Sequence, residues 1–310
     1  MNKSIFYFAF ALMLSNILHA QNLLTPELLW KLNRVSGLGI SKDKKFVVYN
    51  VSTPNIEANK STSRKYFLSL SDGKSFPIVN IDSLLQDQSI SPDGKYQLSD
   101  APVKIKKIRG EDLYTSLTKS NAYIYESLNN RHWDTWEDGA YAHLFVAPMG
   151  KASAAIDIMK GEAFDCPQKP HGGAEDFEWN PNGKELVYVC KKLSGKAYAQ
   201  STNTDLYLYT LETAKTKNIT KGMMGYDMQP AYNEDGSLLA WTSMRRDGFE
   251  ADKNDLYVMN TSTKWMAKLT GDFDETVSSF KWKAANERSI PYIKKSTERI
   301  FKKKNKNYFR

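Results

Sequence analysis

The chain has 310 residues and a net charge of +8, and 41% of its residues are hydrophobic and 25% charged. Its mean hydropathy is −0.54. These values exclude a polytopic membrane protein and a fully disordered chain, and the length suffices for one large domain or two modest ones. The positive charge lies at the ends, because Lys294 to Arg310 carry seven of the eight net charges and Lys3 carries the other. The body of the chain is neutral, so we expect no nucleic-acid partner.

The N-terminus has the layout of an export signal. Lys3 precedes an uninterrupted apolar run from Ile5 to Leu14, and Ala20 supplies the small residue of a cleavage site. We predict a signal peptide over residues 1–20 that is cleaved after Ala20, which makes the mature protein exported, periplasmic and free of the membrane. The alternative is a buried N-terminal helix, and the apolar run is too short to span a bilayer comfortably.

A turn of the form Ser/Asn-x-Asp/Asn-Gly-Lys recurs along the chain, each time after an apolar or aromatic residue and before a short apolar run. The intervals between successive copies are about 50, 89, 53 and 50 residues. Such turns, flanked by β-branched and aromatic residues, predict hairpins. The copies are Ser41–Lys45, Ser91–Lys95, Asn180–Lys184, Asn233–Ser237 and a decayed copy at Lys283–Glu287.

A second element repeats with the same period. Asp205–Tyr209 returns as Asp255–Met259, and each is followed by a polar turn and a closing strand. A 50-residue unit with four short strands predicts an all-β fold, a β-propeller of four-stranded blades. The alternative, a β-sandwich with similar hairpins, does not account for two elements that repeat together.

The propeller is expected to occupy residues 21–293 and to be incomplete. The 89-residue interval contains an irregular insertion, about residues 102–139, and a long insertion in a propeller is expected at one mouth of the channel. Residues 294–310 are expected to form a basic disordered tail.

The cysteines and histidines give no metal site. Cys166 and Cys190 have no metal-ligand spacing, and their separation neither requires nor forbids a disulfide. The histidines of the mature chain do not form a paired ligand motif, so we expect neither a metal nor another cofactor.

Several stretches together resemble the N-terminal half of exported serine peptidases of the prolyl-oligopeptidase (S9) family. The resemblance is to the dipeptidyl peptidase V and acylaminoacyl-peptidase branch, and it covers about residues 23–283. The matching stretches are Leu24–Trp30, Arg34–Ser36, Arg131–Trp136, Ala197–Tyr198, Ser201–Tyr207, Gly222–Asp227 and Met244–Asp252.

The resemblance implies a propeller followed by an α/β-hydrolase domain that releases N-terminal dipeptides or acyl-amino acids from peptides. A hydrolase domain needs a G-x-S-x-G nucleophile elbow, and this sequence does not contain one. We therefore assign no catalytic residues and expect a propeller portion truncated before the catalytic domain and inactive alone. Its partners are peptide substrates if a hydrolase domain is joined to it. The alternative is a stand-alone periplasmic propeller that binds a protein or peptide, and a third possibility, a lyase or sugar-binding propeller, finds no supporting residues.

The resemblance also implies that the propeller filters substrates and forms one wall of the active-site cavity. The α-ammonium group of a peptide then needs a carboxylate in a partly dry site, and tryptophans provide an apolar wall. The alternative is that the acids are solvated, that the tryptophans clamp adjacent blades, and that Arg131 pairs with an acid. For Arg245, Arg246 and Asp247 we expect an ion pair between blades. The candidate substrate-binding residues are Arg131, His132, Trp133, Asp134, Trp136, Glu137, Glu175 and Asp176, with Asp138 as a further acid of the insertion.

Overall fold

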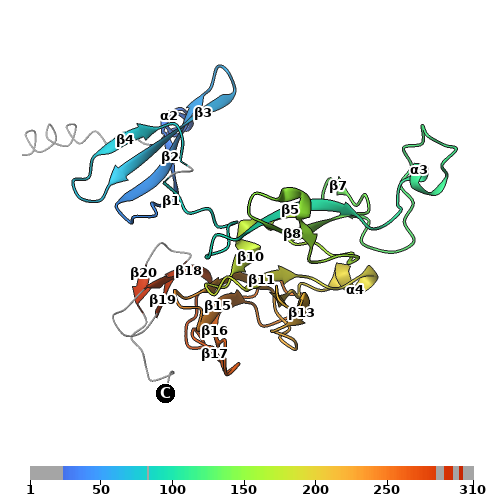
Figure 1. The fold of residues 1–310 in the computed structure, drawn as a ribbon. Coiled ribbons are helices and arrows are strands. Elements are labelled where there is room, and N and C mark those ends of the chain that lie inside the picture. The colour runs from blue at the N-terminus through green and yellow to red at the C-terminus, as the bar shows by residue number, and fades with distance from the viewer. Residues whose placement is uncertain (1–23, 82–83, 284–289, 296–299, 303–310) are drawn as a thin grey trace, which may run out of the picture. The chain divides into compact units, whose positions relative to one another are not determined.

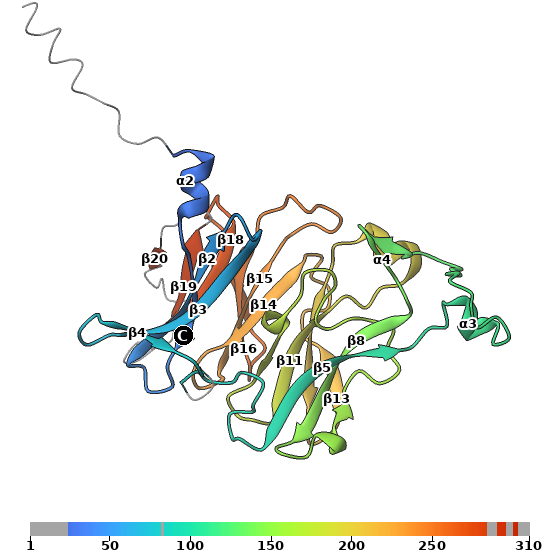
Figure 2. The ribbon, with the colours of Figure 1, turned by 90° about the horizontal axis from the view of Figure 1, so that it is seen from above.

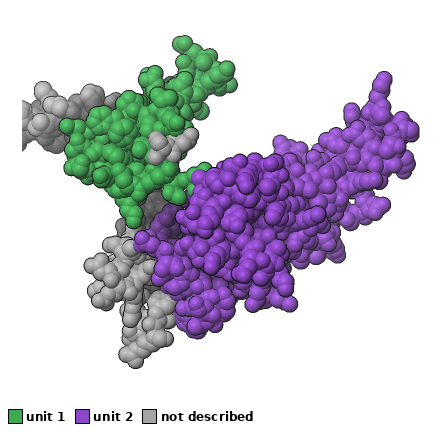
Figure 3. Space-filling view, viewed as in Figure 1, with its two compact units in different colours: residues 1–87 green, residues 88–310 purple. Residues whose placement is uncertain are grey.

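The computed structural model describes residues 24–81, 84–283, 290–295 and 300–302 (Figure 1). The predicted signal peptide lies outside these ranges, as do most of the predicted basic tail and residues 284–287 of the decayed turn. The chain divides into two compact units, residues 1–87 and 88–310 (Figure 3). Over the described ranges, every helix is too short or too polar to cross a membrane.

The first unit contains one four-stranded antiparallel sheet, blade 1, in which consecutive strands are neighbours. A short helix, α2 (Pro26–Lys31), precedes it, and the Thr25 hydroxyl caps this helix by accepting the Leu28 N–H at 3.2 Å. Aromatic side chains of neighbouring strands pack against each other in this sheet. The centre of the Phe67 ring lies 5.1 Å from that of Phe46 and 5.3 Å from that of Phe76. The strands are β1 (Arg34–Ile40), β2 (Phe46–Asn55), β3 (Lys60–Ser69) and β4 (Ser75–Ile78).

The second unit contains further sheets of the same kind. Blades 3 and 4 each have four antiparallel strands in sequence order, which confirms the predicted four-stranded blades. Blade 2 has three strands, and Ile90 forms an isolated bridge with Gln97 in the place of its first strand. Blade 2 consists of β5 (Tyr96–Lys104), β8 (Ala140–Pro148) and β9 (Ile156–Asp157), and blade 3 of β10 (Phe177–Trp179), β11 (Glu185–Cys190), β12 (Asp205–Thr210) and β13 (Lys215–Asn218). Blade 4 consists of β14 (Asp227–Tyr232), β15 (Leu238–Ser243), β16 (Asp255–Asn260) and β17 (Met266–Lys268), and blade 5 of β18 (Val277–Lys283), β19 (Ile290–Lys295) and β20 (Ile300–Lys302).

The repeated turns share one hydrogen-bond pattern. In each of the first four copies, the side chain at the third position accepts the backbone N–H of the fifth, for example Lys95 N–H to Asp93 Oδ1 at 3.2 Å and Lys184 N–H to Asn182 Oδ1 at 2.8 Å. The fourth residue has a positive φ, +67° at Gly183, which explains why glycine is favoured there. The turn is therefore fixed by local interactions and can be read from the sequence.

The second repeated element closes each of blades 3 and 4. In blade 4 the Thr270 hydroxyl accepts the Leu256 N–H at 2.8 Å and donates to Asp255 Oδ1 at 2.9 Å. In blade 3 Thr220 and Asp205 repeat the second of these bonds at 3.4 Å. This contact ties the start of the third strand to the end of the fourth, which explains why Asp-Leu-Tyr and a later threonine recur together.

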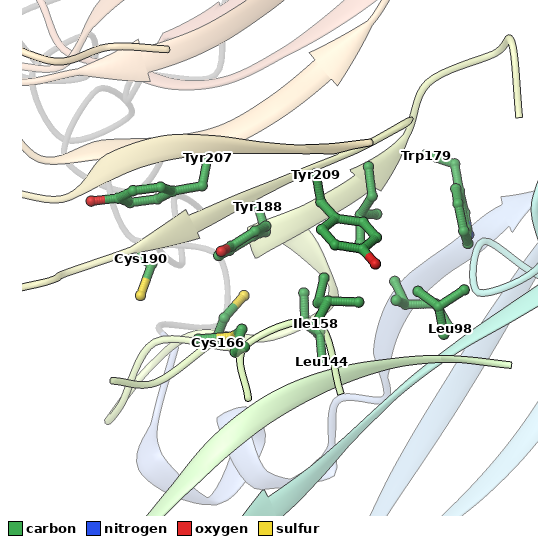
Figure 4. Close-up of a cluster of buried hydrophobic side chains, with 12 residues drawn as sticks. Leu98, Leu144, Ile158, Cys166, Trp179, Tyr188, Cys190, Tyr207 and Tyr209 are labelled. Atoms are coloured by element: carbon green, nitrogen blue, oxygen red, sulfur yellow. The ribbon is translucent and has the colours of Figure 1, made fainter. Parts of the chain in front are cut away.

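Successive residues of β11 face two different blades. Leu186 and Tyr188 pack in a buried cluster with Leu144 of blade 2 (Figure 4), whereas Val187 packs in another with Trp241 of blade 4. This follows from the alternation of side chains along a strand. Figure 2 shows these sheets of the second unit in succession. Both faces of blades 3 and 4 are covered, as in a propeller and unlike a two-sheet sandwich. A third cluster joins blades 4 and 5 and includes Ala240, Leu256, Val258, Val277 and Phe280.

Two tryptophans join neighbouring blades: Trp179 directly precedes the third turn, and Trp282 precedes the sequence of the decayed copy. The indole N–H of Trp179 donates to the Ser89 carbonyl of blade 2 at 3.1 Å, and that of Trp282 donates to the Ala231 carbonyl of blade 4 at 2.9 Å. Each accepting carbonyl stands two residues before the turn of its own blade. The aromatic residue before the turn thus has a repeated role, since its indole links one blade to the blade before it.

The long connections of blades 2, 3 and 4 emerge at the same end. Strands alternate in direction, so the tight turns after first strands lie at one end of a blade and the connections after second strands lie at the other. Of the predicted insertion, residues 105–139 fall between β5 and β8, whereas residues 102–104 are the end of β5. The insertion contains α3 (Gly110–Leu113) and a two-stranded hairpin, β6 (Arg131–His132) and β7 (Thr135–Trp136), while α4 (Gly195–Gln200) follows β11. Figure 1 shows α3, β7 and α4 at this end of blades 2 and 3.

Candidate functional site

A cavity of about 400 Å³ lies at the loop end of blades 2 and 3. One wall comes from the insertion, a second from the chain that follows β9, and a third from the chain that follows β11. The volume is within the range of small-molecule and peptide-side-chain pockets. Its lining residues are Lys106, Lys107, Ile108, Leu113, Ile124–Asn129, Glu137, Tyr141, Ala163, Phe164, Asp165, Leu193, Ser194, Gly195 and Tyr198.

Glu137 is the candidate acid that reaches this cavity. Its backbone is fixed by two hydrogen bonds, because its carbonyl accepts the Tyr125 hydroxyl at 2.6 Å and its N–H donates to the Asn130 carbonyl at 3.0 Å. Burial raises the pKa of its carboxyl above the ordinary value, and the charge of Lys169 opposes this shift. Within the described ranges no ion pair of Glu137 is found, and Lys169 is paired with Asp165 instead. Glu137 is thus a partly desolvated carboxylate with capacity for a cationic ligand.

The second acid of the cavity, Asp165, is already engaged. It is buried, accepts the Ala142 N–H at 2.8 Å and forms an ion pair with Lys169 at 3.1 Å. The ammonium groups of Lys169 and Lys106 lie 5.9 and 5.6 Å from the ring centre of Tyr141. Asp165 therefore balances a nearby lysine. The third acid of the lining, Glu126, is exposed, so Glu137 is the partly buried acid of this cavity that is left for a ligand.

Tyrosines form much of the wall around Glu137. Burial raises the pKa of the Tyr198 hydroxyl, and the Lys191 ammonium lies 4.2 Å from the centre of its ring. Burial lowers the pKa of Lys191 itself. Sequence reasoning missed Tyr141, Asp165 and Tyr198 as lining residues, although Ala197–Tyr198 is one of the stretches that carry the family resemblance.

An aromatic cluster lies beside the cavity. The rings of Tyr123, Tyr125 and Trp136 are each 6.1 Å from the other two and nearly parallel. The guanidinium groups of Arg109 and Arg131 lie 5.2 Å from the ring centres of Tyr123 and Trp136. The structure places the Arg131 charge against an indole ring, and within the described ranges no ion pair of Arg131 with an acid is found.

The two tryptophans of the Arg131–Trp136 motif separate. Trp133 occupies the turn of the β6–β7 hairpin with φ of +51°, and 68% of it is exposed. Its ring lies 5.1 Å from that of His132 and 5.0 Å from that of His171, whereas Trp136 joins the aromatic cluster. The hairpin thus directs the two indoles into different surroundings, and they do not form one wall.

The remaining candidate acids do not line the cavity. Asp134 is exposed, and Asp138 accepts the Ala140 N–H at 2.9 Å. Asp176 is buried at the end of the 3₁₀ turn η2 (Ala174–Asp176) and accepts the Gln168 N–H at 2.7 Å, and burial raises its pKa to about 6. Glu175 precedes it in the turn and is exposed. These four acids have structural or solvated positions.

Two of the stretches that carry the family resemblance contact each other between blades 3 and 4. Asp247 accepts the Ser201 hydroxyl at 2.6 Å and the Thr202 N–H at 2.8 Å. Arg246 forms an ion pair with Asp252 of its own loop at 3.3 Å. The expected contact between blades is therefore made by hydrogen bonds to Asp247, and the ion pair predicted to join the blades is local.

The four-stranded blades and the relatives named dipeptidyl-peptidase 5 described next show that the chain is the propeller portion of a prolyl-oligopeptidase (S9) family peptidase, as the resemblance predicted. The chain is 33% identical to dipeptidyl-peptidase 5 of Porphyromonas gingivalis over 87% of this chain and 46% of that protein. It is 31% identical to dipeptidyl-peptidase 5 of Porphyromonas endodontalis over 77% and 41%. The chain thus spans less than half the length of these curated relatives.

The comparison with solved structures supports the fold. Acylaminoacyl peptidase of Pyrococcus horikoshii matches with a TM-score of 0.52 and 13% identity, over 86% of this chain and 43% of that one. No family model matches the chain.

Proposed function

We propose that this chain is the substrate-handling propeller portion of an exported S9 exopeptidase that releases N-terminal dipeptides or acyl-amino acids. The observation that carries the proposal is the cavity at the loop end of blades 2 and 3 with the Glu137 carboxylate in its wall. The relationship to proteins named dipeptidyl-peptidase 5 supports the peptide as substrate class. Hydrolysis itself requires a catalytic domain with a nucleophile elbow.

In this proposal Glu137 receives the α-ammonium group of the peptide. The carboxylate is partly desolvated, so a cation that reaches it forms a charge-assisted hydrogen bond of more than ordinary strength. The tyrosines of the wall exclude water from this contact and pack on the first side chain of the peptide. The limited volume admits a chain end and excludes a folded protein.

Replacing Glu137 by glutamine is expected to weaken binding of a dipeptide amide with a free N-terminus about tenfold or more, because a hydrogen bond to a charged group contributes about 1.5–3 kcal/mol. Isothermal titration with alanyl-phenylalanine amide measures this loss. Binding to the unmodified protein should weaken as the pH falls through the raised pKa of Glu137, since protonation removes the negative charge.

The matched controls are the N-acetylated dipeptide amide, which lacks the ammonium group, and the variant Asp134→Asn, which changes an exposed acid of the same segment. Glu137→Gln should not affect the acetylated peptide, and Asp134→Asn should bind as the unmodified protein does. Equal affinity for free and acetylated peptides would contradict the role of Glu137.

The chain alone is expected to hydrolyse neither dipeptidyl nor acyl-aminoacyl reporter substrates, because its sequence holds no G-x-S-x-G elbow. A fluorophosphonate probe for activated serines should leave the purified protein unlabelled. Specific labelling of one serine would overturn this part of the proposal. N-terminal sequencing of the protein recovered from a bacterial periplasm tests export, with Gln21 as the expected first residue.

A further inference from the structure

The chain contains two cysteines, and both are free, fully buried thiols that belong to different segments. Cys190 is the last residue of β11 in blade 3. Cys166 lies in the connection between β9 and β10, and its N–H donates to the Ala142 carbonyl of β8 in blade 2 at 2.9 Å. The two thiols therefore approach the boundary of blades 2 and 3 from opposite sides.

Both sulfur atoms enter the same cluster. Cys166 and Cys190 pack with Leu144 and Tyr188 in the core between the two blades. Figure 4 shows the Cys190 side chain directed away from β11 and the Cys166 side chain directed toward that strand, so that both sulfurs lie in one layer of side chains. Burial raises the pKa of each thiol, and the charge of the Cys190 thiolate raises the pKa of Cys166 further.

We propose that Cys166 and Cys190 form a disulfide that fastens blade 2 to blade 3 and holds two walls of the cavity together. Ala163, Phe164 and Asp165 line the cavity immediately before Cys166 in the sequence. Leu193 begins the second of these walls only three residues after Cys190. A covalent bond between the two cysteines therefore anchors both walls at their bases.

The oxidant is a small-molecule disulfide such as oxidised glutathione. One cysteine thiolate attacks the glutathione disulfide, forms a mixed disulfide and releases one glutathione thiol. The second cysteine then attacks the protein sulfur of the mixed disulfide and releases the second glutathione. Two protein thiols are oxidised and one glutathione disulfide is reduced to two thiols. Because thiolate is the reacting form and burial suppresses it, the bond is expected to form while the chain folds.

The test is to refold the purified chain in a mixture of reduced and oxidised glutathione and then to denature it and alkylate it without reductant. Peptide mapping by mass spectrometry should recover the peptides of Cys166 and Cys190 joined and unmodified. The oxidised protein should unfold at a temperature about 5 °C or more above the reduced protein, because a cross-link restricts the unfolded chain.

Cys166→Ala and Cys190→Ala serve as matched variants. Each variant alone should abolish the difference in unfolding temperature between oxidising and reducing buffers. The double variant should also unfold at the same temperature in the two buffers. If a variant does not fold, the peptide map of the unmodified chain still decides. Alkylation of both cysteines in the refolded chain, stable glutathione adducts or intermolecular dimers would each overturn the proposal.

Amide hydrogen exchange then tests the link to the cavity. Residues 163–165 and 193–198 should exchange more slowly in the oxidised protein than in the reduced protein, while the β16–β17 turn of blade 4 should be unchanged. Equal exchange rates in the two states would show that the disulfide does not restrain the cavity walls. This outcome would overturn the proposed effect on the cavity.

Discussion

Trp241→Ala should lower the free energy of unfolding by about 4 kcal/mol, because removal of a buried aromatic side chain leaves a large cavity in a close-packed core. Trp241 is fully buried between blades 3 and 4, and its ring stacks on that of Tyr257 at 5.8 Å between centres. Its neighbours come from β11 and β16 as well as β15, so a collapse of the core into the space left by the indole would disturb two blades. Urea denaturation followed by circular dichroism measures the loss.

Trp133→Ala is the matched control, since it removes the same side chain from a position that is 68% exposed. Its cost is expected to remain below about 1 kcal/mol. Similar losses for the two variants would contradict the assignment of Trp241 to the core between blades.

Asp227→Asn is expected to make stability less dependent on pH and to stabilise the protein at pH 8. Asp227 is fully buried at the start of β14, and burial raises the pKa of its carboxyl to about 7. The hydroxyl groups of Ser243 and Thr220 oppose this shift. An asparagine has nearly the same shape and carries no charge at any pH. The variant therefore avoids the free-energy cost of burying an ionised carboxylate.

The sign follows from proton binding. Between the ordinary pKa of 3.8 and the raised value near 7, the folded state holds a proton at Asp227 that the unfolded state has released. The stability of the unmodified protein therefore falls as the pH rises through this window, and the full penalty, of the order of 4 kcal/mol, applies above pH 7.

Thermal unfolding of both proteins at pH 5 and pH 8 measures the effect. The gain from Asp227→Asn should be larger at pH 8 than at pH 5, and an exposed-acid variant, Asp134→Asn, should show no such change. A gain of the same size at the two pH values would contradict a buried, titrating Asp227.

The blades could be predicted from the sequence because their signals are local. Each tight turn closes through bonds among neighbouring residues, as between Asp93 and the Lys95 N–H, and the strands on either side alternate in the expected way. The recurrence of Asp205 and Asp255 was visible for the same reason, since each bonds a threonine 15 residues later in its own blade.

The candidate site was predicted only in part. Glu137 was found because it lies in the insertion next to a recognisable motif, but the cavity also needs residues that come from distant segments, such as Asp165 and Tyr198. The spacing of Trp133 and Trp136 suggested one apolar wall, whereas a two-residue turn sends them apart. Spacing along the sequence does not show a reversal of the chain inside a short motif.

The alternation along β11 also determines where the sequence can change length. Leu186 and Tyr188 serve one interface and Val187 the other, so a one-residue insertion or deletion within this strand would exchange the two sets and spoil both cores together. The connections between strands do not alternate between two buried interfaces, so a change in their length does not exchange two sets of core residues. Length variation among related chains should therefore collect in segments such as residues 105–139, and the shape of the cavity can diverge while the blades retain a constant size.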